Sequence, residues 1–113
     1  MLVTNRFVID ADVATTFTER AHAALAALAA RPGYRRGQLL RAFDDPRHWC
    51  LLTEWESVGS YRRALGAFDV KVYATPLLAE SLDEPSAYEP LAAAEPGGSV
   101  VVSASDRAAD PNR

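Results

Sequence analysis

Cysteine is nearly absent from this sequence. Cys50 is the only one among 113 residues, so no disulfide can form within the chain, and such usage is typical of a reducing compartment. Long apolar runs are absent too, because no stretch reaches the ~18 apolar residues of a membrane span. The first ten residues lack the basic and then apolar order of a signal peptide. We therefore expect a cytoplasmic protein that has no membrane as a partner.

Clusters of basic residues are also scarce. The chain has 12 basic and 15 acidic residues, for a net charge of −3, and arginines are adjacent only at 35–36 and 62–63. Nucleic-acid binding needs a basic stripe, so we expect no nucleic-acid partner. Two histidines and one cysteine do not make a metal-ligand cluster. Phosphate-binding glycine loops and dinucleotide fingerprints are missing, so the sequence predicts neither a metal nor a nucleotide cofactor.

What the chain does have is enough apolar material for one core. Hydrophobic residues make up 49 %, and the length suits a single domain. A domain this small buries only about 60–70 % of its unfolded surface, so self-association would add stability. From residue 93 the composition turns to glycine and small or charged residues. We expect a folded domain over 1–92 and a flexible tail over 93–113, in which 100–102 could pair transiently or on dimerisation.

Hydrophobic periodicity predicts an alternation of strands and helices. Val3 and Phe7 stand at the even spacing typical of one face of a strand. Over 13–28, apolar residues recur every three or four positions, which is the pattern of one face of a helix. Asp10 or Asp12 could cap the first helix through a carboxylate, and Ser57 the second through its hydroxyl. The expected strands are 2–9, 34–42, 49–55 and, weakly, 86–92; the expected helices are about 13–31, 57–67 and a short one from Asp69 that Pro76 bends or ends.

The order strand, helix, strand, strand, helix, strand predicts a ferredoxin-like α+β fold with an antiparallel sheet. Its helices would cover one sheet face and leave the other to water or to a second copy. On the third strand, Trp49, Leu51 and Trp55 alternate with Cys50 and Leu52, so both faces carry apolar bulk. The sequence therefore predicts a homodimer in which two sheets face each other.

Three short motifs resemble one known family. They are Thr4-Asn5-Arg6, Pro32-Gly33-Tyr34 followed by Gly37-Gln38-Leu39-Leu40-Arg41, and Leu51-Leu52-Thr53-Glu54-Trp55-Glu56-Ser57. The chain is similar over about 2–91 to the antibiotic biosynthesis monooxygenases, and the motifs mark the fold of that family better than its activity. The resemblance implies a dimeric α/β-barrel.

The resemblance also implies where an active site would lie. Members of the family include cofactor-free oxygenases that convert polyketide anthrones to quinones, and haem-degrading monooxygenases. Both groups typically use an Asn on the first strand and a Trp and a His on the second helix. Asn5 matches the first, but ungapped alignment from Trp55 places Ala64 and Tyr73 at the other two positions. The missing axial His argues against haem degradation, although Tyr ligates haem iron in other folds.

Three polar residues are candidates for catalysis, each with a structural alternative. Asn5 could polarise a carbonyl or enolate oxygen, or be an amide satisfied by backbone groups. Tyr73 could serve as a hydrogen-bonding or acid/base group at a pocket mouth, or pack as an ordinary aromatic. His48, at the entrance of the third strand, could transfer protons or be solvated. Cys50 is expected to behave as a small buried hydrophobe.

The function predicted from these features is a monooxygenase without metal, flavin or other cofactor, acting on an aromatic or polycyclic, polyketide-like substrate. A small aromatic molecule would thus be its partner, lying between helices and sheet. The expected wall residues are Phe7, Phe17, Leu40, Trp55 and Tyr61. Two alternatives stay open. One is a non-catalytic binding or accessory protein that kept the fold, and the other is a haem-binding protein with Tyr73 as ligand.

Overall fold

The computed structural model describes residues 1–105, and the last part of the predicted tail, 106–113, lies outside the described residues. The elements follow in the order β1 (Leu2–Val8), the 3-10 turn η1 (Ala11–Val13), α1 (Ala14–Ala29), β2 (Tyr34–Arg41), β3 (His48–Trp55), α2 (Val58–Leu65), α3 (Phe68–Tyr73), α4 (Thr75–Leu78), β4 (Ala87–Tyr88), β5 (Ala92–Ala93) and β6 (Val101–Val102).

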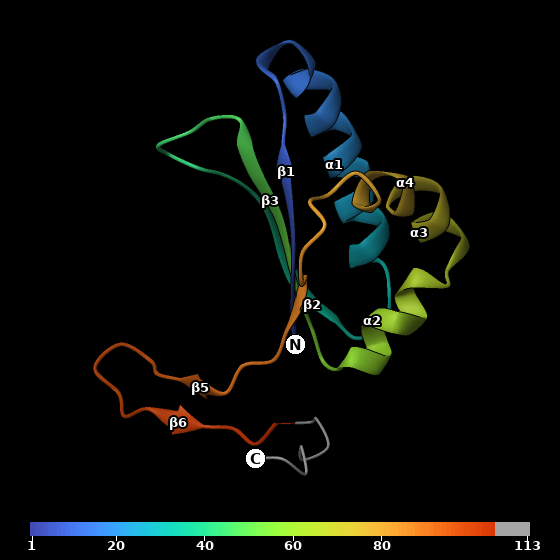
Figure 1. Ribbon diagram of the computed structural model, residues 1–113. Coiled ribbons are helices and arrows are strands. Elements are labelled where there is room, and N and C mark those ends of the chain that lie inside the picture. Colours follow the sequence, from blue (N-terminus) through green and yellow to red (C-terminus); the bar gives the residue numbers. More distant parts are fainter. Residues whose placement is uncertain (106–113) are drawn as a thin grey trace.

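The main sheet has four antiparallel strands in the order β2-β3-β1-β4. Helices α1 to α4 lie on one side of it, and within residues 1–105 no element covers the other side of its centre (Figure 1). The prediction of a ferredoxin-like α+β fold is confirmed, and the weak fourth strand lies at the sheet edge, as expected. The sheet of one chain does not close into a barrel, so the α/β-barrel of a dimer stays a prediction.

The central pair of strands fixes which side chains meet the helices. Asn5 lies opposite Leu51 and Phe7 opposite Trp49 in the register of β1 and β3. Side chains alternate between faces along a strand, so Val3, Asn5 and Phe7 share the helix-facing side with the odd-numbered residues of β3. Val3 and Phe7 are each 1 % exposed.

Helix α1 provides most of the cover over the sheet. Its buried side chains are Phe17, Ala21, Ala24, Ala27 and Leu28, which recur at the three- and four-residue steps of one helical face. The small alanines let the helix lie close to the strands. Gly37 on β2 serves the same purpose, because a Cβ there would stand 2.8 Å from Cδ1 of Leu25 on α1.

The turn between α1 and β2 depends on glycine. Gly33 has a φ of +87°, which lies in the left-handed region that side chains disfavour. A Cβ there would also collide with the Ser60 side chain of α2 at 2.3 Å. The breaker pair Pro32-Gly33 therefore ends α1 and lets the start of α2 approach this turn.

One of the two predicted helix caps formed. The hydroxyl of Ser57 accepts a hydrogen bond from the backbone N–H of Ser60 at 3.1 Å, which confirms the cap of α2. The predicted carboxylate cap of α1 is wrong. Its cap residue is Val13, and the 3-10 turn before it is closed by a backbone bond from the Val13 N–H to the carbonyl of Asp10, whose side chain caps nothing.

The segment after β4 forms a hairpin of its own. β5 pairs with β6 through Ala92 opposite Val102 and Ala93 opposite Val101, and the hairpin extends away from the helices (Figure 1). Its three valines at 100–102 are exposed. Val101 and Val102 thus pair within the chain, and the pairing of 100–102 on dimerisation and the flexibility of the tail stay predictions.

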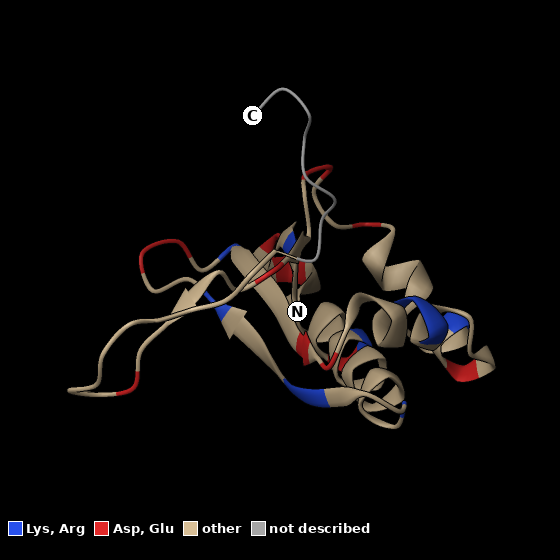
Figure 2. Cartoon of the chain, turned by 90° about the horizontal axis from the view of Figure 1, so that it is seen from below, with Lys and Arg blue, Asp and Glu red and all other residues tan. Residues whose placement is uncertain are grey.

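Charges of both signs are spread over the helices, the sheet and the turns, as Figure 2 shows. Several form cross-element pairs, such as Arg6 with Glu84 at 2.5 Å and Arg36 with Glu54 at 3.1 Å. These pairs are exposed, so each contributes little to stability. None of the helices in the described part of the chain has the length and apolar character that crossing a bilayer requires.

Replacing Leu51 with alanine should cost about 2–5 kcal/mol in the free energy of unfolding, since Leu51 is 1 % exposed at the centre of the sheet and truncation leaves a cavity. Urea unfolding measures the change. Leu82→Ala is the matched control, because Leu82 is exposed and should lose less than about 1 kcal/mol. Equal losses in the two variants would contradict the assignment of Leu51 to the core.

Candidate functional site

Asn5 is the one polar residue of β1 on the helix-facing side of the sheet. Its neighbours on that side, Val3 and Phe7, are fully buried, whereas Asn5 keeps part of its surface accessible. Among the described residues, no side chain or backbone group forms a hydrogen bond with the Asn5 amide. The amide therefore remains available to a ligand, in a largely apolar setting where a hydrogen bond is stronger than in water.

An aromatic cluster of Trp55, Tyr34 and Tyr61 packs the start of α2 against the sheet. Trp55 is 0 % exposed, and its indole N–H donates to the Thr53 hydroxyl at 2.9 Å. Tyr34 meets the Trp55 ring edge-on with centroids 5.4 Å apart, and Tyr61 of α2 lies against it at 5.5 Å. These contacts hold Tyr61 between the strand and the outer helix surface.

Tyr61 opens onto a groove between α2 and the helices α3 and α4. The groove has a volume of about 640 Å³, and its lining residues are Tyr61, Leu65, Lys71, Thr75, Leu78 and Ala79. Burial raises the pKa of the Tyr61 phenol, so its hydroxyl stays a hydrogen-bond donor at neutral pH. The apolar floor and the few polar groups suit a flat organic ligand.

A second, smaller pocket lies at the other end of the helix-facing side. Its volume is about 270 Å³, and it is lined by Phe7, Ile9, Val13, Thr16, Phe17, Arg20, Leu77 and Glu80. Phe7 and Phe17 meet there with ring centroids 5.1 Å apart. An ion pair between Arg20 and Glu80 joins α1 to the end of α4 at this pocket.

Two predicted site residues lie on the opposite face of the sheet. His48 pairs with Val8 of β1, and Leu40 with Cys50 of β3, which places both on the side without helices. Leu40 is 39 % exposed. Asn5, Phe7, Phe17, Trp55 and Tyr61 thus lie on the helix-covered side of the sheet, where Phe7 meets Phe17 and Trp55 meets Tyr61 in two separate groups, and His48 and Leu40 lie on the other side.

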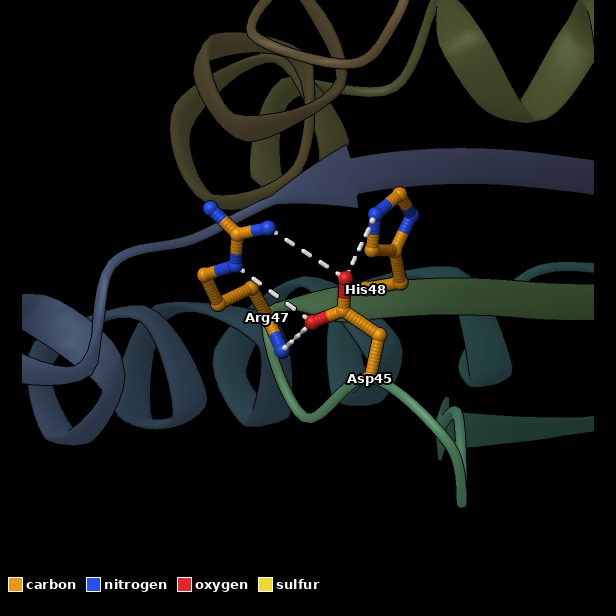
Figure 3. Close-up of polar contacts among 3 residues, drawn as sticks. All are labelled: Asp45, Arg47 and His48. Carbon is orange, nitrogen blue, oxygen red and sulfur yellow. Dashed lines mark hydrogen bonds and ion pairs between the residues drawn. The ribbon is translucent and has the colours of Figure 1, made fainter.

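His48 belongs instead to a small polar cluster at the β2–β3 turn, which Figure 3 shows. Its Nε2 lies 3.3 Å from a carboxylate oxygen of Asp45. Asp45 also accepts hydrogen bonds from the side chain and backbone N–H of Arg47. Those bonds to Arg47, together with its charge and that of His48, hold the pKa of the Asp45 carboxyl below its usual value. Through its contact with Asp45, His48 is part of the structure of the β2–β3 turn.

Tyr73 lies at the end of α3 and is 55 % exposed. It does not line the groove, whose contribution from α3 is Lys71. Ala64, at the other position where the resemblance expects an active-site residue, lies on the buried face of α2. No contact tests the roles predicted for Tyr73 and His48, so they stay predictions.

Sequence analysis did not single out most of the residues that line the groove. Its members beyond Tyr61 are Leu65, Lys71, Thr75, Leu78 and Ala79. A signal was present, because 61 and 65 are four residues apart and so are 71, 75 and 79, the spacing of helical stripes. Pro76 hid this spacing, because a proline predicts the end of a helix. In the structure Pro76 lies in the first turn of α4, where its missing N–H costs nothing, so residues 71, 75 and 79 still line one groove.

Metal ligands do not gather in this structure. Within residues 1–105, no group of three or more His, Cys, Asp or Glu side chains is arranged to hold a metal ion. Burial raises the pKa of the Cys50 thiol, which favours the protonated form and lowers its reactivity.

Comparisons with known proteins agree with this architecture. A model of the family "Antibiotic biosynthesis monooxygenase" matches residues 1–75. SnoaB, a cofactor-independent oxygenase from Streptomyces nogalater, is 28 % identical, with a TM-score of 0.63 over 80 % of this chain and 94 % of that one. No curated protein matches the chain significantly.

Two more distant structures show the same fold. Rv0793 from Mycobacterium tuberculosis is 20 % identical, with a TM-score of 0.61 over 96 % of this chain and 97 % of that one. A conserved protein from Methanosarcina mazei Go1 is 19 % identical, with a TM-score of 0.63 over 76 % and 84 %.

The chain folds as a small ferredoxin-like α+β protein with a groove in its helix layer. The family match covers well over half of the chain. The chain therefore belongs to the antibiotic biosynthesis monooxygenase family, as its motifs predicted.

Replacing Arg47 with glutamine should raise the pKa of the Asp45 carboxyl toward its ordinary value, because the side-chain hydrogen bonds from Arg47 are the main cause of its depression. Titration of the Asp45 side-chain carbon by NMR measures the shift. Arg35→Gln removes a charge without touching the cluster and should leave Asp45 unchanged. A pKa of Asp45 that is the same in Arg47→Gln as in the parent would contradict this assignment.

Proposed function

We propose that this protein is a cofactor-independent monooxygenase that acts on an aromatic or polycyclic, polyketide-like substrate. The observation that carries the proposal is the Asn5 amide, which has no hydrogen-bond partner among the described residues and lies between buried Val3 and Phe7 on the helix-facing side of the sheet. The similarity to SnoaB, at 28 % identity, supports the reaction class. Its lone Cys50 would stay reduced in the cytoplasm, where we place it.

The chemistry needs little from the protein besides a dry pocket and a suitable donor. A reduced aromatic such as an anthrone loses a proton to water to give a stabilised carbanion, which can pass one electron to O₂. Recombination of the two radicals forms a carbon–oxygen bond and a peroxide anion, which takes up a proton. Loss of the remaining hydrogen on that carbon and cleavage of the O–O bond then release water and leave the quinone carbonyl. Overall, a CH₂ group and O₂ become a C=O group and water. Asn5 would donate to the oxygen on which the negative charge develops.

The surroundings of Asn5 suit this role. Phe7 and Phe17 exclude water from one side, and Trp55 with Tyr61 form the wall further along the sheet. A hydrogen bond to developing charge gains strength in such a low-dielectric setting. The Tyr61 hydroxyl, which burial keeps protonated by raising its pKa, is a second donor for the substrate.

A non-catalytic binding protein is the alternative that a specific observation favours. Ala64 and Tyr73 stand where the family resemblance expects Trp and His. Ala64 is buried and has no polar side-chain group, and Tyr73 is exposed at the end of α3, so neither supplies the buried polar group that the resemblance expects. Haem binding has less support. His22 is exposed on α1 and His48 lies on the opposite sheet face.

We also propose a homodimer formed through the uncovered face of the sheet. That face carries the apolar side chains of Leu2, Val8, Leu40, Cys50 and Leu52. A hollow of about 450 Å³, lined by Leu2, Arg36, Gly37, Gln38, Leu52 and Glu54, lies on it. A second sheet would bury these side chains, which gains about 25 cal/mol per Å² of apolar surface.

The change Asn5→Ala should lower protein-dependent oxygen consumption with an anthrone substrate by about 100-fold, the usual effect of removing one donor to a developing oxyanion. An oxygen electrode measures the rate without added metal or flavin. Thr4→Ala is the control, since Thr4 is the neighbouring residue of β1 and its side chain points to the other face. Unchanged turnover in Asn5→Ala would sink the proposed role.

The change Leu52→Glu should convert the dimer to a monomer, because it places a charge at the centre of the proposed interface. Sedimentation equilibrium gives the mass. Val72→Glu introduces the same charge on α3, where Val72 is exposed on the helix layer, and should leave the dimer intact. A parent protein that sediments as a monomer at every concentration would refute the interface.

A further inference from the structure

The groove between α2 and α3–α4 carries a single positive charge at its rim. That charge is Lys71, the only lysine among the chain's 12 basic residues. Within the described part of the chain, no carboxylate forms an ion pair with its ammonium group. The lysine therefore stands at the edge of an apolar surface with its charge uncompensated by the fold.

The acidic groups nearest along the helices do not neutralise it. Asp69 is exposed in the first turn of the same helix. Glu80, which follows the end of α4, is engaged by Arg20 of α1 in the other pocket. The ammonium of Lys71 is thus free to meet a ligand's negative charge.

The rest of the groove suits a flat ring system. Tyr61, Leu65 and Leu78 are partly buried and form its floor, while Lys71, Thr75 and Ala79 are exposed at its rim. The Tyr61 and Thr75 hydroxyls can donate hydrogen bonds alongside the lysine. An apolar floor with a cation and two hydroxyl groups recognises an aromatic body that carries an anionic group.

We propose that this groove binds an aromatic or polycyclic anion, with the carboxylate or acidic phenolate of the ligand on Lys71 and its rings on Tyr61, Leu65 and Leu78. Lys71 is then a specificity residue, which selects anionic over neutral ligands of the same shape. The inference rests on the proposed function, because it describes the charged end of that substrate.

Asn5 lies outside the lining of the groove. Asn5 is level with Leu51 on β3, and Tyr61 packs on Trp55, four residues further along the same strand. At about 3.3 Å per residue, these positions are ~13 Å apart. A substrate with its acid group on Lys71 and its reacting carbon at Asn5 would have to span this length, beyond the residues that line the groove.

The test compares anthracene-2-carboxylate with its neutral amide, anthracene-2-carboxamide, by the fluorescence anisotropy of the anthracene ring. The parent protein should bind the acid about fivefold more tightly than the amide, which corresponds to about 1 kcal/mol for a partly screened charge pair. Lys71→Met keeps most of the apolar stem and should remove this preference. Added salt should weaken binding of the acid and not of the amide.

A matched control separates a contact from a general effect of charge. Arg62→Met removes one positive charge from α2 without touching the groove, so it should retain the preference for the acid. Equal affinities for acid and amide in the parent, an undiminished preference in Lys71→Met, or no binding of either compound would each overturn the inference.

Oxygen consumption distinguishes this inference from the proposed function. If the parent binds the acid through Lys71 but consumes no oxygen with anthrone acids, the groove assignment stands and the monooxygenase proposal fails. If the parent oxidises anthrones and Lys71→Met does so with unchanged KM for acidic and neutral substrates, the monooxygenase stands and the role of Lys71 fails.

Discussion

The burial of Trp55 is the constraint on which the candidate site depends. The indole leaves its strand toward the helices, is fully buried, and satisfies its only polar group by donating to Thr53. Tyr34 of β2 and Tyr61 of α2 pack against the same ring. One side chain thus joins two strands to a helix and sets the height of α2 above the sheet. The groove beside Tyr61 exists because that height is fixed.

The two faces of the main sheet differ in the side chains that they carry. The helix-facing side holds the aromatic residues and the Asn5 amide, which has no hydrogen-bond partner within residues 1–105 and for which we propose a hydrogen bond to a substrate, strengthened by the apolar setting. The uncovered side holds aliphatic residues and ion pairs such as Arg36 with Glu54, which suit contact with a second sheet. The strict alternation of side chains along β1 and β3 makes this division. A one-residue shift in register would exchange the two sets.

Much of the fold could be predicted from the sequence, because local signals and the global pattern agree. Alternation in β1 and β3, the Pro32-Gly33 break and the Ser57 cap all appear in the structure, whereas the carboxylate cap of α1 was displaced by a 3-10 turn. The candidate site was harder to predict from the sequence. Strand alternation places Asn5 on the helix-facing side of the sheet, and it places His48, which was predicted to transfer protons, on the opposite side. The four-residue spacing of 71, 75 and 79 was visible in the sequence, but how α3 and α4 pack beside α2 to make the groove is a tertiary arrangement that this spacing does not specify.

The most direct test of the account is the NMR response of the Asn5 side-chain amide to an aromatic ligand. The chain has two asparagines, Asn5 and Asn112, so selective ¹⁵N-asparagine labelling gives one pair of side-chain amide signals for each. Titration with a soluble anthraquinone, the product form of the proposed substrate, should shift the Asn5 amide protons, as a new hydrogen bond to the quinone oxygen requires. Binding of the quinone that leaves both Asn5 amide protons unmoved would contradict the placement of the site.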